Sequence, residues 1–258
     1  MSTSLFDNII FGPIKSRRLG NSLGINLLPL ASKFCNFDCI YCECGWTGNV
    51  KNSVKNLPNV HTVTEHLMNK IQKLLDSNIT IHSITFAGNG EPTLHPKFEE
   101  IMIDVLLVRN LMVPDAKISI LSNGTMLHKT SVAEAMQEVD HCILKLDAGT
   151  EVLFQKINQP MGGITIQKIK KNLLKLRGIL TVQTLFFRGE HKGERIDNTT
   201  PEEIEAWINH LVDLQPKQVM LYSLDRPSPA DKLVPVSRKE LDVIADKLRP
   251  YQIKTLIA

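Results

Sequence analysis

The sequence predicts an α/β fold built as a barrel or partial barrel of six strand–helix units followed by a last strand. Two observations predict it. Apolar runs of strand length alternate with amphipathic helical patterns along the whole chain. Most of these runs are almost continuously apolar, which is typical of parallel strands covered on both faces. An open doubly wound sheet fits the pattern almost as well.

The predicted strands are spaced for right-handed crossover connections. In chain order they cover residues 24–28, 83–87, 117–121, 142–146, 180–186, 218–222 and 252–257.

The predicted helices between them carry start and stop signals. Ser/Thr-x-x-Glu capping boxes are formed by Ser131 with Glu134, Thr200 with Glu203 and Ser237 with Glu240. An apolar stripe at helical spacing is formed by Val63, Leu67, Ile71, Leu74 and Leu75. Pro201 suits a first helical turn, and Gly178 is expected to end a helix over residues 164–177.

The composition is that of a globular protein, with 258 residues, 43% hydrophobic and 22% charged. We expect one core domain over 1–258, with an N-terminal segment and first strand (1–34) and a closing loop, helix and strand (223–258). No stretch approaches the ~18 apolar residues of a membrane span, and residues 1–8 do not resemble a signal peptide. We therefore expect a cytoplasmic protein without a membrane partner.

The net charge of +3 does not by itself indicate nucleic-acid binding. Two basic clusters stand out, namely Lys15/Arg17/Arg18 and Lys168/Lys170/Lys171/Lys175. The second falls on a predicted amphipathic helix, so we interpret it as a solvated helix face.

Four of the five cysteines fall between Cys35 and Cys44. Cys35, Cys39 and Cys42 form a CxxxCxxC run in the loop after the first predicted strand, and such clustering favours a metal site over a disulfide scaffold. Thiolates suit iron–sulfur clusters and zinc. Three thiolates would leave one iron of a four-iron cluster open. The alternative is a closed zinc site completed by Cys44. Cys142, on an apolar strand, is expected to be a core residue.

Around this motif the chain resembles the radical S-adenosylmethionine (radical SAM) superfamily over nearly its whole length. Tyr41 places an aromatic residue before the third cysteine, and the segment FAGNGEPTL over residues 86–94 is similar to the family's GGEP motif, with Asn89 in place of the first glycine. The resemblance implies a partial (β/α)6 TIM-like barrel, a [4Fe–4S] cluster on the three cysteines, and S-adenosylmethionine bound by Tyr41, Gly90 and Glu91. Taken alone, the glycine segment also suits a strand-to-helix turn.

Two further strand ends fit the resemblance. Ser122 and Asn123 follow the third strand, where family members place contacts to the methionyl carboxylate or ribose. Lys145 and Asp147 end the fourth strand and are the catalytic candidates, since Lys145 could pair with a carboxylate or face the substrate. The alternative is a lysine that snorkels at the barrel rim.

A sharper similarity links the chain to the radical enzymes grouped with wyosine synthases. It rests on residues 11–20 and 22–26, on 145–149, and on Asp225-Arg226-Pro227. The tRNA-acting wyosine synthases carry additional N-terminal cysteines, and this chain has none before Cys35. It is therefore similar to a shorter, bacterial-type relative whose substrate need not be tRNA.

Other polar residues near strand ends have weaker signals. Substrate contacts or ordinary rim polarity are equally good interpretations of Tyr222, Arg188, Asp225 and Arg226. We expect His95 and His191 to be solvated loop residues, and Trp46 either to shield the cluster or to lie on the surface.

The resemblance implies an enzyme that reductively cleaves S-adenosylmethionine to a 5′-deoxyadenosyl radical, which abstracts hydrogen from a substrate. It implies a one-electron donor such as flavodoxin or ferredoxin. tRNA modification is one candidate activity, and a peptide, small metabolite or partner protein is the alternative substrate. A non-enzymatic zinc or iron–sulfur module is the alternative of a different class.

Overall fold

A computed structural model describes residues 4–16, 18–48 and 57–258 as alternating strands and helices. The strands are β1 (Ile10–Ser16), β2 (Gly20–Ile25), β3 (Ser83–Phe86), β4 (Lys117–Ser122), β5 (His141–Lys145), β6 (Leu180–His191), β7 (Glu194–Asp197), β8 (Gln218–Ser223), β9 (Lys232–Pro235) and β10 (Thr255–Ile257). The helices are α1 (Val60–Asp76), α2 (Phe98–Met112), α3 (Thr130–Ala135), α4 (Glu151–Asn158), α5 (Ile166–Leu173), α6 (Pro201–Leu214) and α7 (Arg238–Asp246).

One sheet connects the strands in the order β1-β2-β3-β4-β5-β6-β8-β10. From β2 to β10 every neighbouring pair is parallel, while β1 pairs antiparallel with β2. Within the described residues no pairing joins β1 to β10, so the sheet is open. The predicted α/β partial barrel is confirmed.

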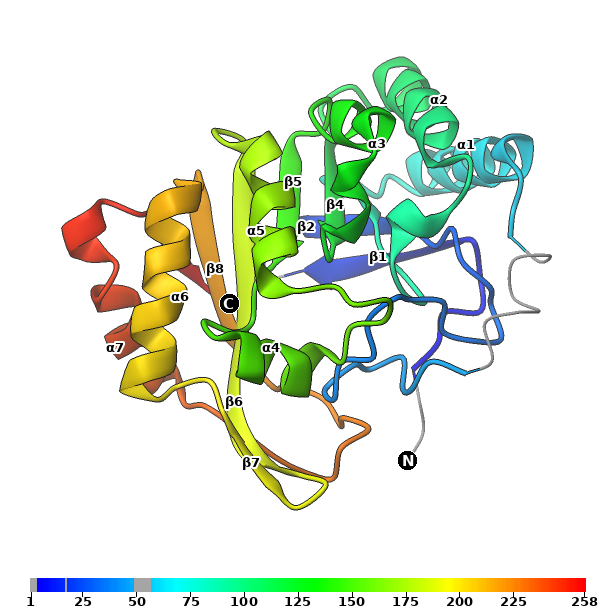
Figure 1. The fold of residues 1–258 in the computed structure, drawn as a ribbon. Coiled ribbons are helices and arrows are strands. Elements are labelled where there is room, and N and C mark those ends of the chain that lie inside the picture. Colours follow the sequence, from blue (N-terminus) through cyan, green and yellow to red (C-terminus); the bar gives the residue numbers. More distant parts are fainter. Residues whose placement is uncertain (1–3, 17, 49–56) are drawn as a thin grey trace.

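All seven predicted strands are present, and three strands were missed. β1 forms one edge of the sheet, and β7 and β9 pair antiparallel with the outer half of β6. β6 runs on to His191, five residues beyond its predicted end. It therefore carries a small antiparallel extension, seen at the bottom of Figure 1.

The helix signals were borne out in part. Ser237 and Glu240 form a complete capping box, and Pro201 lies in the first turn of α6. Thr200 caps α6, but the Glu203 carboxylate instead accepts from the backbone N–H groups of Gly149 and Thr150.

The box predicted for Ser131 and Glu134 was wrong. α3 begins one residue earlier, at Thr130, and has no side-chain cap. The Ser131 hydroxyl is drawn away because it donates to Oε1 of Glu99 on α2, at 2.6 Å. The helix predicted over 164–177 is α5 continued by a short 3-10 turn, and Gly178 follows with φ +90°.

The helices lie along the outer face of the sheet, with α1, α2 and α3 over one half and α5, α6 and α7 over the other (Figure 1). The apolar stripe of α1 is buried at Val63, Leu67, Ile71 and Leu74, while Leu75 stays exposed. Cys142 is fully buried on β5, as predicted. No helix within the described residues is long and apolar enough to cross a membrane.

Candidate active site at the carboxyl ends of the strands

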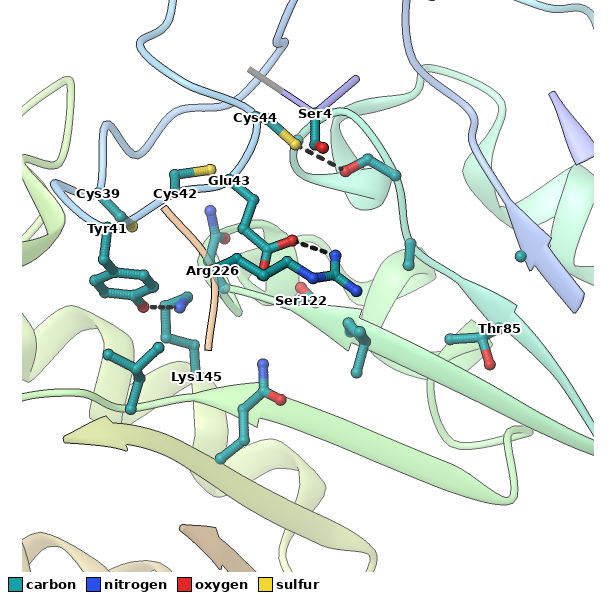
Figure 2. A pocket seen from close by; sticks show the side chains of 18 of the residues that line it. Ser4, Cys39, Tyr41, Cys42, Glu43, Cys44, Thr85, Ser122, Lys145 and Arg226 are labelled. Carbon is teal, nitrogen blue, oxygen red and sulfur yellow. Dashed lines mark hydrogen bonds and ion pairs between the residues drawn. The ribbon is translucent and has the colours of Figure 1, made fainter. Parts of the chain in front are cut away.

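A pocket of about 480 Å³ opens inside the curved sheet. Its walls come from the loop after β2, the loop after β3, the ends of β4, β5, β6 and β8, and the β1–β2 turn. The volume falls within the ~300–1,000 Å³ typical of small-molecule sites. The carboxyl ends of parallel strands are where α/β barrels position functional loops, and Figure 2 shows side chains from several of these segments facing one another.

The loop that carries the cysteines follows β2 and is anchored on both sides. The backbone N–H groups of Asp38 and Ile40 donate to carbonyls at the end of α4, at 2.9 and 3.0 Å. The Asp38 carboxylate accepts from the backbone N–H of Thr47 at 2.8 Å, which closes the loop on itself. Cys35, Cys39 and Cys42 all line the pocket from this loop.

The donor set fits a thiolate-bound cluster. All five cysteines are free thiols. Hydrogen-bond donors already point at two sulfurs, because Phe37 N lies 3.4 Å from Sγ of Cys35 and Asn158 Nδ2 lies 3.4 Å from Sγ of Cys39. Such N–H groups stabilise thiolates and tune iron–sulfur clusters.

The electrostatics of the thiols differ along the loop. Burial raises the pKa of Cys39, and burial together with the nearby Glu91 raises that of Cys35. A hydrogen bond from the Cys44 thiol instead lowers the pKa of Cys42 to about 6, against the effect of burial. Cys44 also approaches the carbonyl of Gly88 at 3.5 Å (Figure 2). It is thus a pocket-lining neighbour of Cys42.

Lys33 is a residue of this loop that sequence reasoning missed. Its side chain is 1% exposed, and its ammonium donates to Asp38 Oδ1 and to the Gly45 carbonyl, both at 3.0 Å. Burial works to lower the pKa of Lys33, but Cys42, Cys39, Cys35 and Asp38 together raise it above its ordinary value. A positive charge therefore lies directly behind the three thiols.

The glycine-rich loop after β3 lies against the start of the cysteine loop. Phe34 and Gly90 form a parallel bridge, with Phe34 N donating to Asn89 O and Glu91 N donating to Phe34 O. Gly90 has φ +142°, and a Cβ there would lie 1.9 Å from the Phe34 carbonyl oxygen. Only glycine allows this approach, which brings Cys35 beside Glu91.

Asn89 replaces the first glycine of the motif, and it has contacts of its own. It is fully buried, and its side-chain amide exchanges two hydrogen bonds with the backbone of Phe6 and donates a third to the Pro29 carbonyl. Its φ is not among the positive values found in this loop. The position therefore does not need glycine, and Asn89 fastens the N-terminal segment to the loop.

Glu91 joins three of the predicted site residues. Its Oε1 accepts from Thr93 N and from the Ser122 hydroxyl at 2.8 Å, and its Oε2 accepts from Asn123 N at 2.6 Å. The carboxylate thus holds the end of β4 against the glycine-rich loop. Asn123 in turn donates to Asn36 Oδ1 at 2.8 Å, which connects β4 to the cysteine loop.

Tyr41, Lys145 and Asp147 form one buried cluster. The Tyr41 hydroxyl donates to Asp147, and the Lys145 ammonium donates to Tyr41 and lies 3.2 Å from Asp147 Oδ2 (Figure 2 labels Tyr41 and Lys145). Burial works to lower the pKa of Lys145, but Asp147, Tyr222 and Cys39 together raise it above its ordinary value. Burial, followed by Asp147, raises the pKa of Tyr41.

The two catalytic candidates occupy different places. Lys145 lines the pocket and is 16% exposed. Asp147 lies behind it, fully buried, and accepts also from Leu185 N and Asn158 Nδ2 at 3.0 Å each. Asp147 is not among the residues that line the pocket, and its contacts orient Tyr41, Lys145 and Asn158. Its catalytic role stays a prediction.

Of the four residues that the sequence left open as substrate contacts, three line the pocket and one does not. The structure places Tyr222, Asp225 and Arg226 in the pocket wall. Arg188 is directed away and pairs with Glu240 at 2.8 Å. Arg17 lies outside the described residues.

The expectations for the histidines and Trp46 need one correction. His95 is buried, not solvated, because its ring bonds the Pro58 carbonyl at 2.9 Å and accepts from Lys97 N. Trp46 is 42% exposed and stacks on His191 at the tip of β6.

Three lysines of the second basic cluster, two on α5 and one on the 3-10 turn that follows it, make contacts within the protein. Lys170 pairs with Asp213, Lys168 donates to the Gly163 carbonyl, and Lys175 donates to the Leu127 carbonyl at 2.7 Å. Lys168, Lys171 and Lys175 are exposed, which supports the interpretation of this cluster as a solvated helix face.

Comparisons with known proteins find matches that cover most of this chain. A family model described as the radical SAM superfamily matches residues 30–198. A UPF0026 protein of Methanocaldococcus jannaschii is 31% identical over 88% of this chain and 66% of its own length. A protein named GTPase Obg from Brachyspira hyodysenteriae is 30% identical over 90% of this chain. This chain spans 32% of that protein and about two thirds of the archaeal one.

Solved structures share the fold at low sequence identity. A radical SAM methyltransferase from Sphaerobacter thermophilus superposes with a TM-score of 0.63 at 14% identity, covering 92% of this chain and 66% of that one. An archaeal TYW1 gives a TM-score of 0.54 at 13% identity, covering 89% and 71%. These likenesses show the fold alone.

Proposed function

Because this chain belongs to the radical SAM superfamily, whose enzymes use a [4Fe–4S] cluster and S-adenosylmethionine, we propose that Cys35, Cys39 and Cys42 bind such a cluster and that the protein is a radical enzyme. The observation that carries the proposal is the pocket itself. Three thiols from one loop line it together with the Gly90–Glu91 backbone and the end of β4. The chemistry supplied there is one-electron cleavage of a carbon–sulfur bond of S-adenosylmethionine, giving methionine and a 5′-deoxyadenosyl radical that abstracts hydrogen from the substrate.

The residues of the chain bind and orient the reactants. Gly90 and Glu91, with Ser122 and Asn123 held by the Glu91 carboxylate, offer backbone and hydroxyl groups to the methionine end of S-adenosylmethionine. Lys145 presents a positive charge to the pocket, and Tyr41 is held beside it. Rigid strand ends suit this positioning role. A one-electron donor completes the reaction, and a flavodoxin or ferredoxin is the proposed kind.

Anaerobic reconstitution with iron and sulfide tests the proposal. We expect the chain to gain the visible absorbance of an iron–sulfur cluster and to release 5′-deoxyadenosine from S-adenosylmethionine when reduced with dithionite. Cys39→Ala should abolish both, and the matched variant Cys44→Ala should retain both. Tightly bound zinc without 5′-deoxyadenosine would instead support the metal-binding alternative, and loss of the cluster in Cys44→Ala would overturn the three-ligand assignment.

For the substrate, we propose two candidate classes. The N-terminal signature over residues 11–26 makes tRNA nucleoside modification one candidate. The second candidate is a small metabolite or peptide, and the pocket volume of about 480 Å³ supports it because that volume is typical of small-molecule sites. Nucleoside profiles of tRNA from wild-type and deletion cells separate the two. A missing modified nucleoside would support the first candidate, and an unchanged profile would contradict it.

A further inference from the structure

Arg18 is a pocket residue that the proposed chemistry does not use. It lies in the turn between β1 and β2, two residues before β2 begins. It therefore enters the pocket from the amino end of β2, whereas the cysteines follow that strand's carboxyl end. Ser16 fixes the turn, since its hydroxyl accepts from the backbone N–H groups of Arg18 and Leu19 at 3.2 and 3.1 Å.

The Arg18 side chain reaches across the pocket to the far strands of the sheet. Nη1 donates to Oε1 of Gln183 on β6 at 3.1 Å. The guanidinium carbon lies 5.2 Å from the ring centroid of Tyr222 on β8. A hydrogen bond at one nitrogen and an aromatic face beneath the group hold its plane in place.

The other pocket-lining cations all have a carboxylate partner. Lys33 pairs with Asp38 at 3.0 Å, Lys145 with Asp147 at 3.2 Å, and Arg226 with Glu43 at 2.6 Å. Among the residues that the structure describes, Arg18 forms no ion pair. A half-buried guanidinium without a carboxylate is costly to keep in a pocket unless an anion joins it there.

The donors of Arg18 suit an oxyanion. A guanidinium has five N–H groups in a planar fork, and Gln183 accepts from only one nitrogen. The same pocket is also lined by the hydroxyls of Ser22 and Thr85, which bond each other at 2.7 Å. A planar fork held by Gln183 and Tyr222 matches the geometry of a carboxylate or phosphate.

We propose that Arg18 anchors an anionic group, a carboxylate or phosphate, carried by the substrate of the radical reaction. This inference rests on the proposed function and names the chemical class of substrate that the same pocket takes. Its position distinguishes it from the residues offered to S-adenosylmethionine, which follow the carboxyl ends of β3 and β4. The Arg18 side chain comes from the β1–β2 turn and faces Gln183 on β6 and Tyr222 on β8, on the side of the pocket where Lys145 lies.

Titration of the cluster-reconstituted protein with inorganic phosphate and with acetate tests the inference by ligand-observed NMR. We expect at least one anion to bind with a Kd on the order of 1 mM. Arg18→Gln should weaken that binding at least tenfold, and Arg18→Lys should recover it only in part because a lysine lacks the planar fork. Lys15→Gln is the matched control, since it removes one positive charge from an exposed residue of β1 outside the pocket.

The same variants are titrated with S-adenosylmethionine, and Arg18→Gln should change that affinity less than twofold. A preference for phosphate over acetate, or the reverse, identifies the anionic group. Equal loss of anion binding in Lys15→Gln and Arg18→Gln would overturn the inference, as would anion binding by neither the wild type nor any variant. A matching loss of S-adenosylmethionine affinity in Arg18→Gln would overturn it by assigning Arg18 to the cofactor. Absence of S-adenosylmethionine binding in the wild type, with Arg18-dependent anion binding intact, would contradict the proposed function and leave the anion subsite supported.

Discussion

Asn89 shows how one residue can depart from a family pattern without loss of the local structure. The glycine-rich loop needs close backbone approach at Gly90, where a Cβ would collide with the Phe34 carbonyl. One position earlier the backbone imposes no such need, so an amide can bond Phe6 and Pro29. A pattern of small residues predicts the loop. Which of its positions must be glycine depends on the backbone segment that packs against it, here that of Phe34.

Lys33 provides the first prediction. We expect Lys33→Met to lower the free energy of unfolding by about 2 kcal/mol, because the Asp38 carboxylate loses its partner inside the loop. Urea unfolding of the reduced apoprotein measures it. The exposed pair of Lys97 with Glu100 gives the control, and Lys97→Met should cost less than ~0.5 kcal/mol.

A double variant separates charge pairing from packing at this position. Lys33→Met with Asp38→Asn should regain part of the lost stability, since no charge is left without a partner. The introduced amide would keep an oxygen that can accept from Thr47 N. A double variant as unstable as Lys33→Met alone would contradict the role assigned to the ion pair.

At the scale of elements, the contact between the cysteine loop and the glycine-rich loop is the junction that forms the site. We expect Gly90→Ala to destabilise the protein by more than about 2 kcal/mol and to prevent iron uptake, because the new methyl group would meet backbone at 1.9 Å. Urea unfolding and iron content after reconstitution measure the two effects.

Gly162→Ala is the control for this prediction. Gly162 also has a positive φ, +71°, but no atom lies within 4 Å of its added Cβ. It should lose only about 1 kcal/mol, the cost of the backbone conformation, and should bind iron normally. Equal iron uptake by both variants would show that the Phe34–Gly90 bridge is not needed for the site.

Asp140 links α2, β4 and β5 and gives a pH-dependent prediction. Burial alone would raise its pKa, but the Ile118 N–H at 2.9 Å and the charges of Lys117 and Arg109 lower it below the ordinary value. In the unfolded chain the carboxyl binds protons more readily. Its stabilising contribution is therefore complete above the unfolded pKa of about 4 and is lost as the pH falls toward the lower folded value.

We expect Asp140→Asn to destabilise the protein by about 1–2 kcal/mol at pH 7 and by progressively less below about pH 4. Thermal or urea unfolding across pH 3–7 tests this. A difference between wild type and variant that stays constant over this range would contradict an electrostatic origin.

The sequence predicted the parallel strands because continuous apolar runs mark them, and it missed β1, β7 and β9 for physical reasons. β1 contains Gly12 and Pro13, which read as turn chemistry and are tolerated because this edge strand has a bulge. β7 and β9 are four residues each and mostly exposed, so no buried face leaves a pattern.

Part of the site could be predicted from the spacing of residues along the sequence, as for Cys35, Cys39 and Cys42. It was not predictable where long-range packing decides. No sequence signal identifies Lys33 or Arg18 as pocket residues, because their burial and partners come from Asp38, Gln183 and Tyr222, which only the folded chain brings near them. The orienting role of Asp147 likewise depends on Asn158 and Leu185.

At the scale of the whole molecule, the fold separates the cysteines into two environments. Four lie on the pocket loop and one, Cys142, is enclosed in the sheet. Burial raises the pKa of Cys142 to about 12. We expect Cys142 in the native protein to be alkylated by iodoacetamide at least about 100-fold more slowly than the loop cysteines as a group.

Mass spectrometry of the labelled peptides measures this distribution in apoprotein and reconstituted protein. Reconstitution should protect Cys35, Cys39 and Cys42, while Cys44 stays reactive. Denaturant should make all five react. Labelling of Cys142 before unfolding would contradict its enclosure, and continued labelling of Cys39 after reconstitution would contradict its role as a ligand.

The position of Trp46 on the cysteine loop, where it stacks on His191, allows the loop to be followed by tryptophan fluorescence. The chain has two tryptophans; Trp207 is buried on α6 against Phe186, and Trp46 lies exposed on the cysteine loop. In a Trp207→Phe variant the remaining indole emission would come from the loop that holds the thiols. A visible chromophore assembled there would quench this emission by energy transfer, so Trp46 offers a native fluorescence signal for following cluster assembly and loss in real time.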